Sequence, residues 1–152
     1  MHWPDHRMSH FHDPAGVRSA PFMAFLGATR TLKQGGLGEV SVEMRQELLN
    51  IHHVAHGGVI LALLDSALAN AAMSRVDFQQ EVVTVNMSTA FMRPAAARTL
   101  TAHARATGGG RSVCFCEGTV VDEAGQVLAS ALATFKYRQR SAGTPDPHAG
   151  AQ

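Results

Sequence analysis

The residues best suited to chemistry lie between Asn50 and Asp65. A carboxamide, Asn50, precedes the sequence His56-Gly57-Gly58, and eight residues after Gly57 one carboxylate, Asp65, interrupts a run of Val, Ile, Leu and Ala. An ionised side chain is seldom buried without partners, because desolvation costs several kcal/mol. We therefore expect Asp65 to have polar partners, an environment that shifts its ionisation, or an edge position facing a cleft. Each of these makes it a candidate working residue.

Composition alone allows a simpler explanation of this acid. Asp65 could share one solvated stripe of an otherwise apolar helix with Ser66, Asn70 and Ser74. These two interpretations are equally compatible with the helix itself, so the residues that precede it must decide between them.

The paired glycines favour the chemical interpretation. At a helix start, Gly57 and Gly58 let backbone N–H groups approach a ligand with no Cβ in the way. Those N–H groups have no partner inside the helix, and the helix dipole adds partial positive charge there. This predicts a pocket for a carbonyl oxygen that becomes negative. Asn50 and Asp65 would complete an acyl-transfer site without a Ser or Cys nucleophile.

The spacing also predicts that two copies of the chain form the site. Gly57 and Asp65 are eight residues apart, which corresponds to about 12 Å along a straight helix. A base and an oxyanion donor that serve one carbonyl must both lie within roughly 3 Å of the reacting atoms. One helix cannot do this, whereas two antiparallel copies can. We expect at least a dimer.

The motif resembles the signature of hot-dog-fold acyl-CoA thioesterases of the phenylacetate-pathway (PaaI-like) type. In that signature an Asn, a His-Gly-Gly element and an Asp follow one another at the spacing seen from Asn50 to Asp65. The resemblance covers roughly residues 20–138, and further segments match in order: Pro21-Phe22, Leu26-Gly27, Val83-Thr84-Val85-Asn86, Phe91-Met92-Arg93-Pro94, Gly110-Arg111-Ser112 and Ala131–Phe135. His-Gly-Gly alone is a weak signal, but the ordered set is specific.

The resemblance implies a role for each catalytic candidate. Asp65 would be the general base or nucleophile, and the backbone of Gly57 the oxyanion donor. Asn50 would hold the attacking water or the thioester, while His56 would stabilise the loop or the carbonyl region. Thr84 matches a position where such enzymes often carry a hydroxyl near the carboxylate.

One position departs from the family pattern. Members usually have glycine three residues after the Asn, where this chain has His53. We therefore expect a differently shaped turn before His56, which would affect the acyl pocket more than the chemistry.

Candidate substrate-binding residues follow a triple-glycine turn. Glycine-rich backbone beside the guanidinium of Arg111 can cradle phosphates. A flexible hairpin with a solvent-facing Arg is about as common, but the resemblance favours contact with coenzyme A. The candidate set is Gly58, Arg93, Gly110, Arg111 and Ser112. The strand–loop–helix context of a Walker or dinucleotide-binding motif is absent.

Histidine clusters raise the question of a metal. They comprise His2, His6, His10 and His12 near the start, and His52, His53 and His56 in the motif loop. Solvated terminal residues and ordinary loop contacts are the commoner outcome for such groups. We expect no metal and no cofactor.

Hydrophobic periodicity predicts the elements that position these residues. Apolar residues on every side of 57–74 predict a core helix, and a short helix is expected at 21–28. Alternation and turn signals predict the strands Thr29–Lys33, Gly38–Gln46, Glu81–Met92, Arg98–Thr107, Arg111–Asp122 and Gln126–Arg138. Sequential strands with tight turns predict an antiparallel meander. The expected fold class is α+β, a hot-dog fold in which the sheet wraps around one apolar helix.

Length and composition indicate the domain organisation and the general class of the protein. The 152 residues predict one domain at 21–138, with a flexible segment at 1–20 and a disordered tail at 139–152. Scattered charges with a net charge of +1 give no reason to expect nucleic-acid binding. The apolar run is too short for a membrane span and carries Asp65 and Asn70. No secretory signal is evident, and Cys114 and Cys116 are read as reduced thiols of a cytoplasmic protein.

These observations favour hydrolysis of an acyl-CoA thioester with an aromatic or medium-chain acyl group. A hot-dog dehydratase or hydratase acting on β-hydroxyacyl thioesters, and a non-catalytic acyl-CoA-binding regulatory module, are the alternatives. The geometry requires at least a homodimer, and the resemblance implies a homotetramer built as a dimer of dimers.

Overall fold

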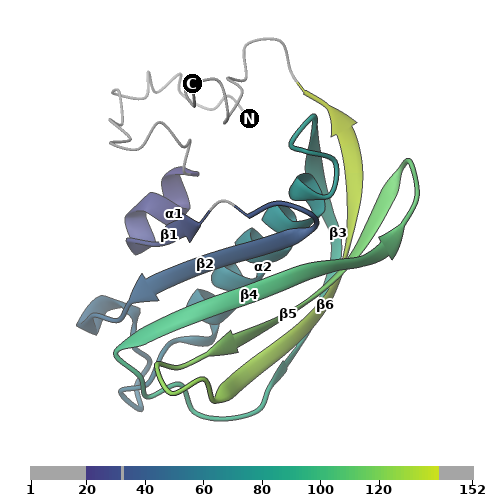
Figure 1. Ribbon diagram of the computed structural model, residues 1–152. Helices are drawn as coiled ribbons and strands as arrows, with labels where there is room; N and C mark the ends of the chain where they lie inside the picture. Colours follow the sequence, from purple (N-terminus) through teal and green to yellow (C-terminus); the bar gives the residue numbers. More distant parts are fainter. Residues whose placement is uncertain (1–19, 32, 141–152) are drawn as a thin grey trace, which may run out of the picture.

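The helices and strands occur along the chain in the order that the sequence predicted. The computed structural model describes residues 20–31 and 33–140. The predicted segment 1–20 lies outside the described residues except for Ala20, as does the predicted tail beyond Arg140. Along the chain the elements are α1 (Pro21–Leu26), β1 (Thr29–Thr31), β2 (Leu37–Glu43), a 3₁₀ helix η1 (Gln46–Leu48), α2 (Gly57–Ser74), β3 (Gln80–Phe91), β4 (Thr99–Gly109), β5 (Val113–Val121) and β6 (Val127–Gln139) (Figure 1).

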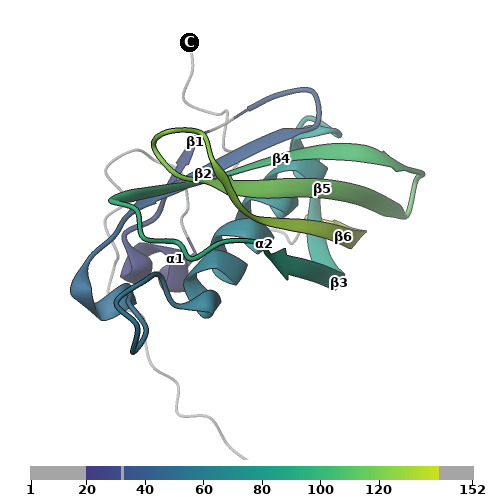
Figure 2. The ribbon, with the colours of Figure 1, turned by 90° about the horizontal axis from the view of Figure 1, so that it is seen from below.

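One antiparallel sheet wraps around α2. Its six strands run in the order β1-β2-β4-β5-β6-β3, and Figure 2 shows α2 running beneath them, with α1 on the same side. Alternation makes one face apolar: Val40 and Val42 of β2 are buried, while their neighbours in sequence are not. The hot-dog fold and the α+β class predicted from the sequence are confirmed.

The predicted meander is correct for β4, β5 and β6 but wrong for β3. Instead of pairing with β4, β3 pairs with β6 along its whole length, and β4 pairs with β2. A hairpin between β3 and β4 would need a turn of about two to five residues. Residues 92–98 and their proline instead carry the chain across the end of the sheet. As a result β3 becomes an edge strand.

Some predicted boundaries also shift. Gln46 begins a 3₁₀ helix instead of ending β2. Two of the three glycines expected in the turn belong to β4, which continues to Gly109, and β6 continues to Gln139. The predicted α2 range is correct.

Backbone contact between β2 and α2 holds the helix close to the sheet. A Cβ added at Gly38 would collide with the carbonyl oxygen of Ala67 and approach the amide nitrogen of Ala71 to 2.8 Å. Glycine is therefore required where the strand crosses the helix. Gly118 of β5 also permits a close approach, here to the neighbouring strand β4, because a Cβ on it would lie 2.9 Å from the carbonyl oxygen of His103.

The composition of α2 predicted a helix buried on every side, but the structure leaves one side of it open. Leu63, Leu64 and Leu68 are fully buried, but Leu61 is 36% exposed and Asp65 is partly exposed on the same stripe. The 18 residues of α2 are long and apolar enough to cross a membrane, and 56% of this helix is buried inside the fold. The helix is the core of the domain, and one stripe of it is left open.

Candidate active site

The start of α2 contains the predicted oxyanion donor. His56 is the N-cap residue, and its Nδ1 accepts a hydrogen bond of 2.9 Å from the backbone N–H of Gly58. This cap satisfies one of the helix's unpaired donors. Among the described residues the N–H of Gly57 has no hydrogen-bond acceptor. Because His56 accepts from Gly58 and not from Gly57, the Gly57 N–H remains available to a ligand. His56 therefore acts on the loop, as one of its two predicted roles required.

Asn50 organises the loop that leads into α2. Its Oδ1 accepts from the backbone N–H of His52 at 2.8 Å and of Val54 at 3.4 Å. The backbone of Asn50 also pairs with Val54 and His53. The carboxamide oxygen therefore shapes the turn, and the NH₂ group is the part that remains for a ligand.

His53 occupies the left-handed region of backbone space, with φ of 58°. Glycine adopts this conformation without the steric cost that a side chain brings. His53 therefore holds a backbone conformation that glycine would adopt more easily, and the difference in turn shape from the family stays a prediction.

Asp65 has a polar partner on the neighbouring strand. Thr84 Oγ1 donates a hydrogen bond of 2.7 Å to Asp65 Oδ1. The hydrogen bond fixes the direction of the carboxylate without neutralising it. Thr84 thus lies close to the acid, as predicted, and Asp65 has a polar partner and is partly exposed.

A β-bulge aims Thr84 at the helix. The pairing of β3 with β6 shifts register between Thr84 and Asn86, so Val85 is an extra residue. Thr84, which is itself exposed, pairs with the buried Phe135, whereas Asn86 pairs with the partly buried Thr134. Without the extra residue, residues 84 and 86 would lie on the same face. The bulge therefore creates the contact with Asp65.

Gly57 and Asp65 lie at different points along one helix, and β3 runs antiparallel beside it. Thr84 meets Asp65, while the ring of Phe91 would lie 3.6 Å from a Cβ at Gly57. Phe91 is more than half exposed at this position. The sequence gave Phe91 no role of its own and named it only within the matching segment Phe91-Met92-Arg93-Pro94.

The candidate substrate residues fall into two groups at opposite ends of α2. Arg93 follows the strand end that contacts Gly57, and its Nη1 donates a 2.6 Å hydrogen bond to the carbonyl oxygen of Val127. Gly110 and Arg111 line a hollow of about 410 Å³ at the other end of the helix. The carbonyl oxygen of Ser112 accepts from the N–H of Tyr137. Within one chain, Arg93 and Arg111 do not meet.

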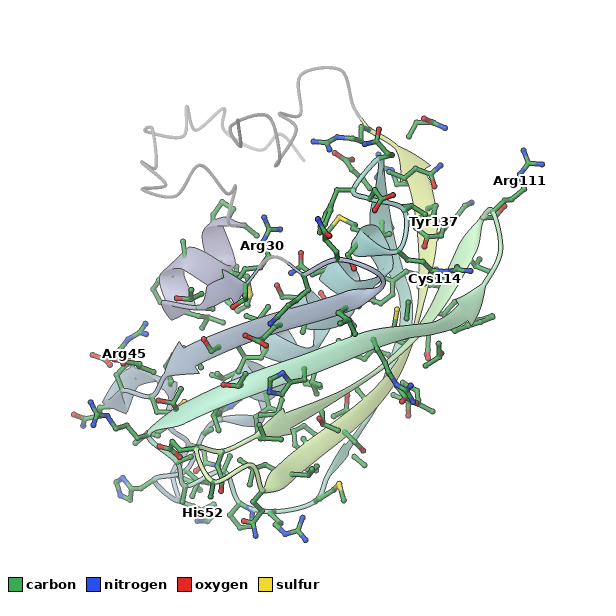
Figure 3. The ribbon with its side chains drawn as sticks, viewed as in Figure 1. Arg30, Arg45, His52, Arg111, Cys114 and Tyr137 are labelled. Atoms are coloured by element: carbon green, nitrogen blue, oxygen red, sulfur yellow. The ribbon has the colours of Figure 1, made fainter. Side chains whose placement is uncertain are left out.

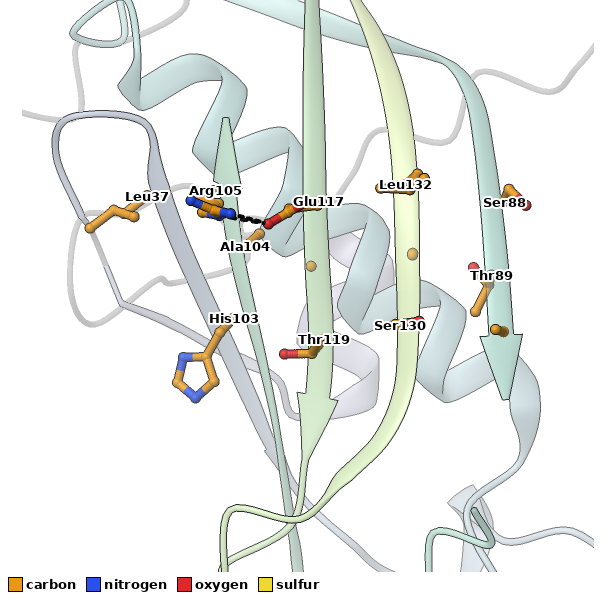
Figure 4. Close-up of a pocket in the computed structure, with 13 residues that line it drawn as sticks. Leu37, Ser88, Thr89, His103, Ala104, Arg105, Glu117, Thr119, Ser130 and Leu132 are labelled. Atoms are coloured by element: carbon orange, nitrogen blue, oxygen red, sulfur yellow. Dashed lines mark hydrogen bonds and ion pairs between the residues drawn. The ribbon is translucent and has the colours of Figure 1, made fainter. Parts of the chain in front are cut away.

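A second hollow, of about 760 Å³, lies along the sheet strands (Figure 4), and Asp65 is not among its lining residues. It contains the Arg105–Glu117 ion pair at 2.6 Å and lies beside Glu39, which pairs with Lys33 and His103. Burial acts to raise the pKa of Glu39, but hydrogen bonds from Lys33 and Thr31 outweigh it and hold the pKa below its usual value. These side chains are paired with one another, and they do not form an acyl-transfer site.

The two cysteines lie in β5 and provide no reactive thiol. Cys114 and Cys116 are free and buried, with sulfur atoms 3.7 Å apart, and burial raises the pKa of Cys116. Protonated, buried thiols are unreactive. Among residues 20–31 and 33–140, no three His, Cys, Asp or Glu side chains gather as metal ligands. The candidate N-terminal histidines lie outside the described residues.

Comparison with known proteins identifies the family. A profile described as the thioesterase superfamily matches residues 52–129, just over half of the chain and the whole of the helix described above. The chain belongs to the thioesterase superfamily. A protein of Thermoplasma volcanium named as a candidate esterase is 33% identical over 102 residues, which are 66% of this chain and 74% of that protein.

Solved structures agree with this membership. The phenylacetic acid degradation protein PaaI of Thermus thermophilus, solved in a mutant form, is 30% identical, with a TM-score of 0.70 over 77% of this chain and 98% of the other. A thioesterase family protein from Silicibacter pomeroyi is 27% identical, with a TM-score of 0.74 over 80% and 91% of the two chains. The predicted resemblance to PaaI-like thioesterases is confirmed, and the superfamily supports hydrolase activity for this member.

Proposed function

We propose that this thioesterase-superfamily protein hydrolyses acyl-CoA thioesters to a free acid and coenzyme A. Asp65 of one protomer activates a water molecule, or attacks the thioester carbonyl to form an anhydride that water then opens. The amide of Gly57 from the partner stabilises the oxyanion. Asn50 holds the water or the thioester through its NH₂ group, and Gly58 supports the same helix turn through its bond to His56.

The hydrogen bond from Thr84 to Asp65 is the observation that carries this proposal. A carboxylate that only solvated the helix would need no fixed partner, and it would be expected among other polar residues. Here the open stripe of α2 also exposes Leu61, which is apolar. A directed acid beside exposed apolar surface is suited to a reaction on a partly apolar substrate.

The dimer required by the reaction is supported by the edge of the sheet. β3 is an edge strand of 12 residues, and Val83, Val85 and Phe91 on it are exposed. A long apolar edge is a surface on which another chain pairs. A twofold axis there would bring the open stripes of two α2 helices together, with Gly57 of each near Asp65 of the other. We further propose that two dimers form a tetramer in the cytoplasm.

The acyl group is proposed to be aromatic or medium-chain. Helix α1 exposes Phe22 and Phe25, and Arg45 ties its end to the region before the motif loop. The guanidinium donates to the carbonyl oxygens of Leu26 at 2.7 Å and Phe25 at 2.8 Å. This anchors an apolar helix beside the catalytic loop, where it can contribute to the acyl pocket.

Replacement of Asp65 by Asn tests the function. We expect Asp65→Asn to keep the fold and lower turnover by roughly two orders of magnitude or more. Release of free thiol would be measured on phenylacetyl-, hydroxybenzoyl-, medium-chain and long-chain acyl-CoAs. Asp77→Asn is the matched control, because Asp77 is exposed beyond the end of α2 and its positive φ suits Asn equally.

The same assay separates the alternatives. Thiol release at the parental rate by Asp65→Asn would show that this acid is not the base. With a β-hydroxyacyl-CoA as an added substrate, an enoyl absorbance change without thiol release would instead identify a dehydratase or hydratase. Tight acyl-CoA binding without turnover by the parent protein would identify a binding module.

A further inference from the structure

One hydroxyl group in the described part of the chain is buried without a hydrogen-bond partner. It is Oγ1 of Thr89, on β3, although other atoms of the same residue reach the surface. Most buried polar groups in proteins are paired, because a buried donor or acceptor that loses water without gaining a partner costs free energy. The partner of this oxygen must come from outside the single chain, or the oxygen remains a cost to the fold.

Thr89 shares a face of β3 with the two residues of the strand that approach α2. Directly paired residues of an antiparallel sheet have their side chains on the same face, and Thr89 pairs with the buried Ala131 of β6. Phe91 pairs with Ala129, which is also buried. Thr84 pairs with a buried residue as well, on the other side of the bulge. The three side chains therefore lie along the face of β3 that contacts the helix.

The part of α2 beside this face is the open stripe, which consists of Gly57, Leu61 and Asp65. These residues follow one another at steps of four, which places them on one side of the helix. Leu61, in the middle, is 36% exposed. The stripe is therefore apolar between the oxyanion donor and the acid.

β3 places Thr89 beside the middle of this stripe. The strand runs from the end of the molecule where Figure 3 labels Tyr137 toward the end where it labels His52. It contacts the acidic end of the stripe near its start and the glycine end at its last residue. Thr89 comes two residues before that last residue, so its side chain belongs to the wall beside Leu61.

The distance of Thr89 from the oxyanion donor indicates what its hydroxyl would bind. Two strand residues separate it from Phe91, which contacts Gly57, and they span about 7 Å. An acyl group whose carbonyl is bound at the Gly57 amide of the same protomer would extend along this apolar wall, and the far end of an aromatic acyl group lies at a similar distance from its carbonyl carbon. Met87 and Thr89 are the residues of this face between the bulge and Phe91, and Thr89 is the polar one.

Rotation of the Thr89 side chain would present the hydroxyl to a bound acyl group. Oγ1 and the methyl group occupy staggered positions on one Cβ, and rotation about χ1 exchanges them. The inward oxygen is unpaired, so a hydrogen bond to a ligand would replace an unsatisfied state instead of a bond within the protein.

We propose that Thr89 selects acyl groups that carry an oxygen substituent, a hydroxyl or a carbonyl, at the end remote from the thioester. This inference rests on the proposed thioester hydrolysis and adds a determinant of its specificity. Thr89 lies between the matching segments Val83–Asn86 and Phe91–Pro94 and belongs to neither. It contacts the acyl group away from the reacting atoms, so it sets specificity and leaves the chemical step to the groups around Asp65.

A matched pair of substrates tests the assignment on Thr89→Val, which removes the hydroxyl and keeps the shape of the side chain. We expect the parent protein to prefer 4-hydroxybenzoyl-CoA to benzoyl-CoA in kcat/KM. Thr89→Val should reduce this ratio by about five- to tenfold, the effect of one hydrogen bond, and should not lower kcat/KM for benzoyl-CoA. Thr89→Ser keeps the hydroxyl and should keep most of the preference.

Thr119→Val is the control for loss of a hydroxyl elsewhere in the sheet. Thr119 is a partly buried residue of β5, labelled in Figure 4, and it alternates with the buried Gly118 and Val120. Its side chain is therefore on the face of the sheet opposite to theirs. We expect the parental substrate ratio in this variant. The same ratio in Thr89→Val as in the parent would overturn the inference.

Thermal unfolding without a ligand gives a second readout. Because Thr89→Val replaces an unpaired oxygen by a methyl group, it should raise Tm by a few degrees while it weakens the preference for the hydroxylated substrate. A structural threonine would show the opposite sign, since loss of a hydrogen bond within the protein lowers Tm. A lowered Tm in Thr89→Val would therefore contradict the inference.

Binding of thioether analogues lets the two proposals fail separately. In 4-hydroxyphenacyl-CoA and phenacyl-CoA a methylene group separates the carbonyl from sulfur, so neither is hydrolysed. If the parent protein hydrolyses neither thioester but binds the hydroxylated analogue more tightly through Thr89, the hydrolytic function is wrong and this inference stands. If both thioesters are hydrolysed and Thr89→Val keeps the parental ratio, the function stands and this inference is wrong.

Discussion

Asp65 shows how much of a residue's role depends on its partner. An acid in an apolar run was ambiguous, because a solvated stripe and a working site have the same composition. The 2.7 Å hydrogen bond from Thr84 gives the carboxylate a fixed direction. Similarly, the ring nitrogen of His56 accepts from the N–H of Gly58, so the amide of Gly57, the proposed oxyanion donor, does not use that cap.

His53 carries a backbone conformation that its side chain does not favour. We expect His53→Gly to equal or exceed the parent's free energy of unfolding, by up to about 1 kcal/mol. His53→Val should lower it by about 1–3 kcal/mol, because a β-branched residue is least suited to positive φ. Chemical denaturation measures both. His52→Val, at a neighbouring exposed residue without positive φ, should have little effect; an equal loss there would contradict the explanation.

Tyr137 predicts a loss of stability at high pH. Burial, followed by its contact with Cys114, raises the pKa of Tyr137 from 10.0 to about 12, while Arg75 opposes the shift. Because the folded state holds the phenol proton more tightly than the unfolded state, this contribution is complete below pH 10. It is lost as the pH rises from there through about 12.

The chain has a single tyrosine, so its ultraviolet absorbance reports this one group. We expect a titration midpoint near pH 12 in the native protein and near 10 in denaturant. A native midpoint near 10 would show that the phenol is solvated and would remove the predicted alkaline instability.

At the scale of elements, glycine controls how closely the sheet and helix approach. β2 crosses α2 with its backbone against the helix backbone, and Gly38 is the point of contact. The bulge at Val85 acts in a comparable way on β3, because it changes which face of the strand Thr84 occupies. Both features set the position of α2 relative to the strands that flank its open stripe.

Gly38→Ala tests the close approach. Because the new methyl group would collide with the Ala67 carbonyl, we expect the free energy of unfolding to fall by about 3 kcal/mol or more. Gly110→Ala is the matched control, since its Cβ would meet nothing within 4 Å and its φ is not positive. That variant should change stability by less than about 0.5 kcal/mol. Similar losses in both variants would contradict the packing explanation.

At the scale of the whole molecule, one chain contains both halves of the proposed site but does not bring them together. Gly57 and Asp65 belong to one rigid helix, so only a second copy can place the amide of the first residue near the carboxylate of the second. The exposed edge of β3 and the open stripe of α2 lie side by side, joined by the Thr84–Asp65 bond. Assembly and activity should therefore depend on the same surface.

Val85→Lys tests that dependence. Val85 is 61% exposed at the bulge of the edge strand, and a lysine there should disfavour pairing with a second edge. We expect light scattering to show a monomer and thiol release to be lost with the dimer. Both should return in part as protein concentration is raised.

Leu132→Lys is the control for this variant. Leu132 is 64% exposed on β6, one strand in from the free edge of β3, so its substitution should leave at least a dimer with its activity. A fully active Val85→Lys monomer would contradict the shared site.

Local sequence patterns predicted the long helix and the main strands of this protein, with boundaries that shift by a few residues, whereas the roles of the candidate residues came from the family resemblance. Helix α2 follows from its apolar run and its His-Gly-Gly start, and the strands follow from alternation, because these signals arise between residues close in the chain. Only the tertiary structure decided that β3 pairs with β6, that Thr84 beside the bulge donates to Asp65, and that Arg75 and Arg111 line one hollow. Those contacts join residues far apart in sequence, and their geometry depends on how strands pack around the helix, which no local pattern encodes.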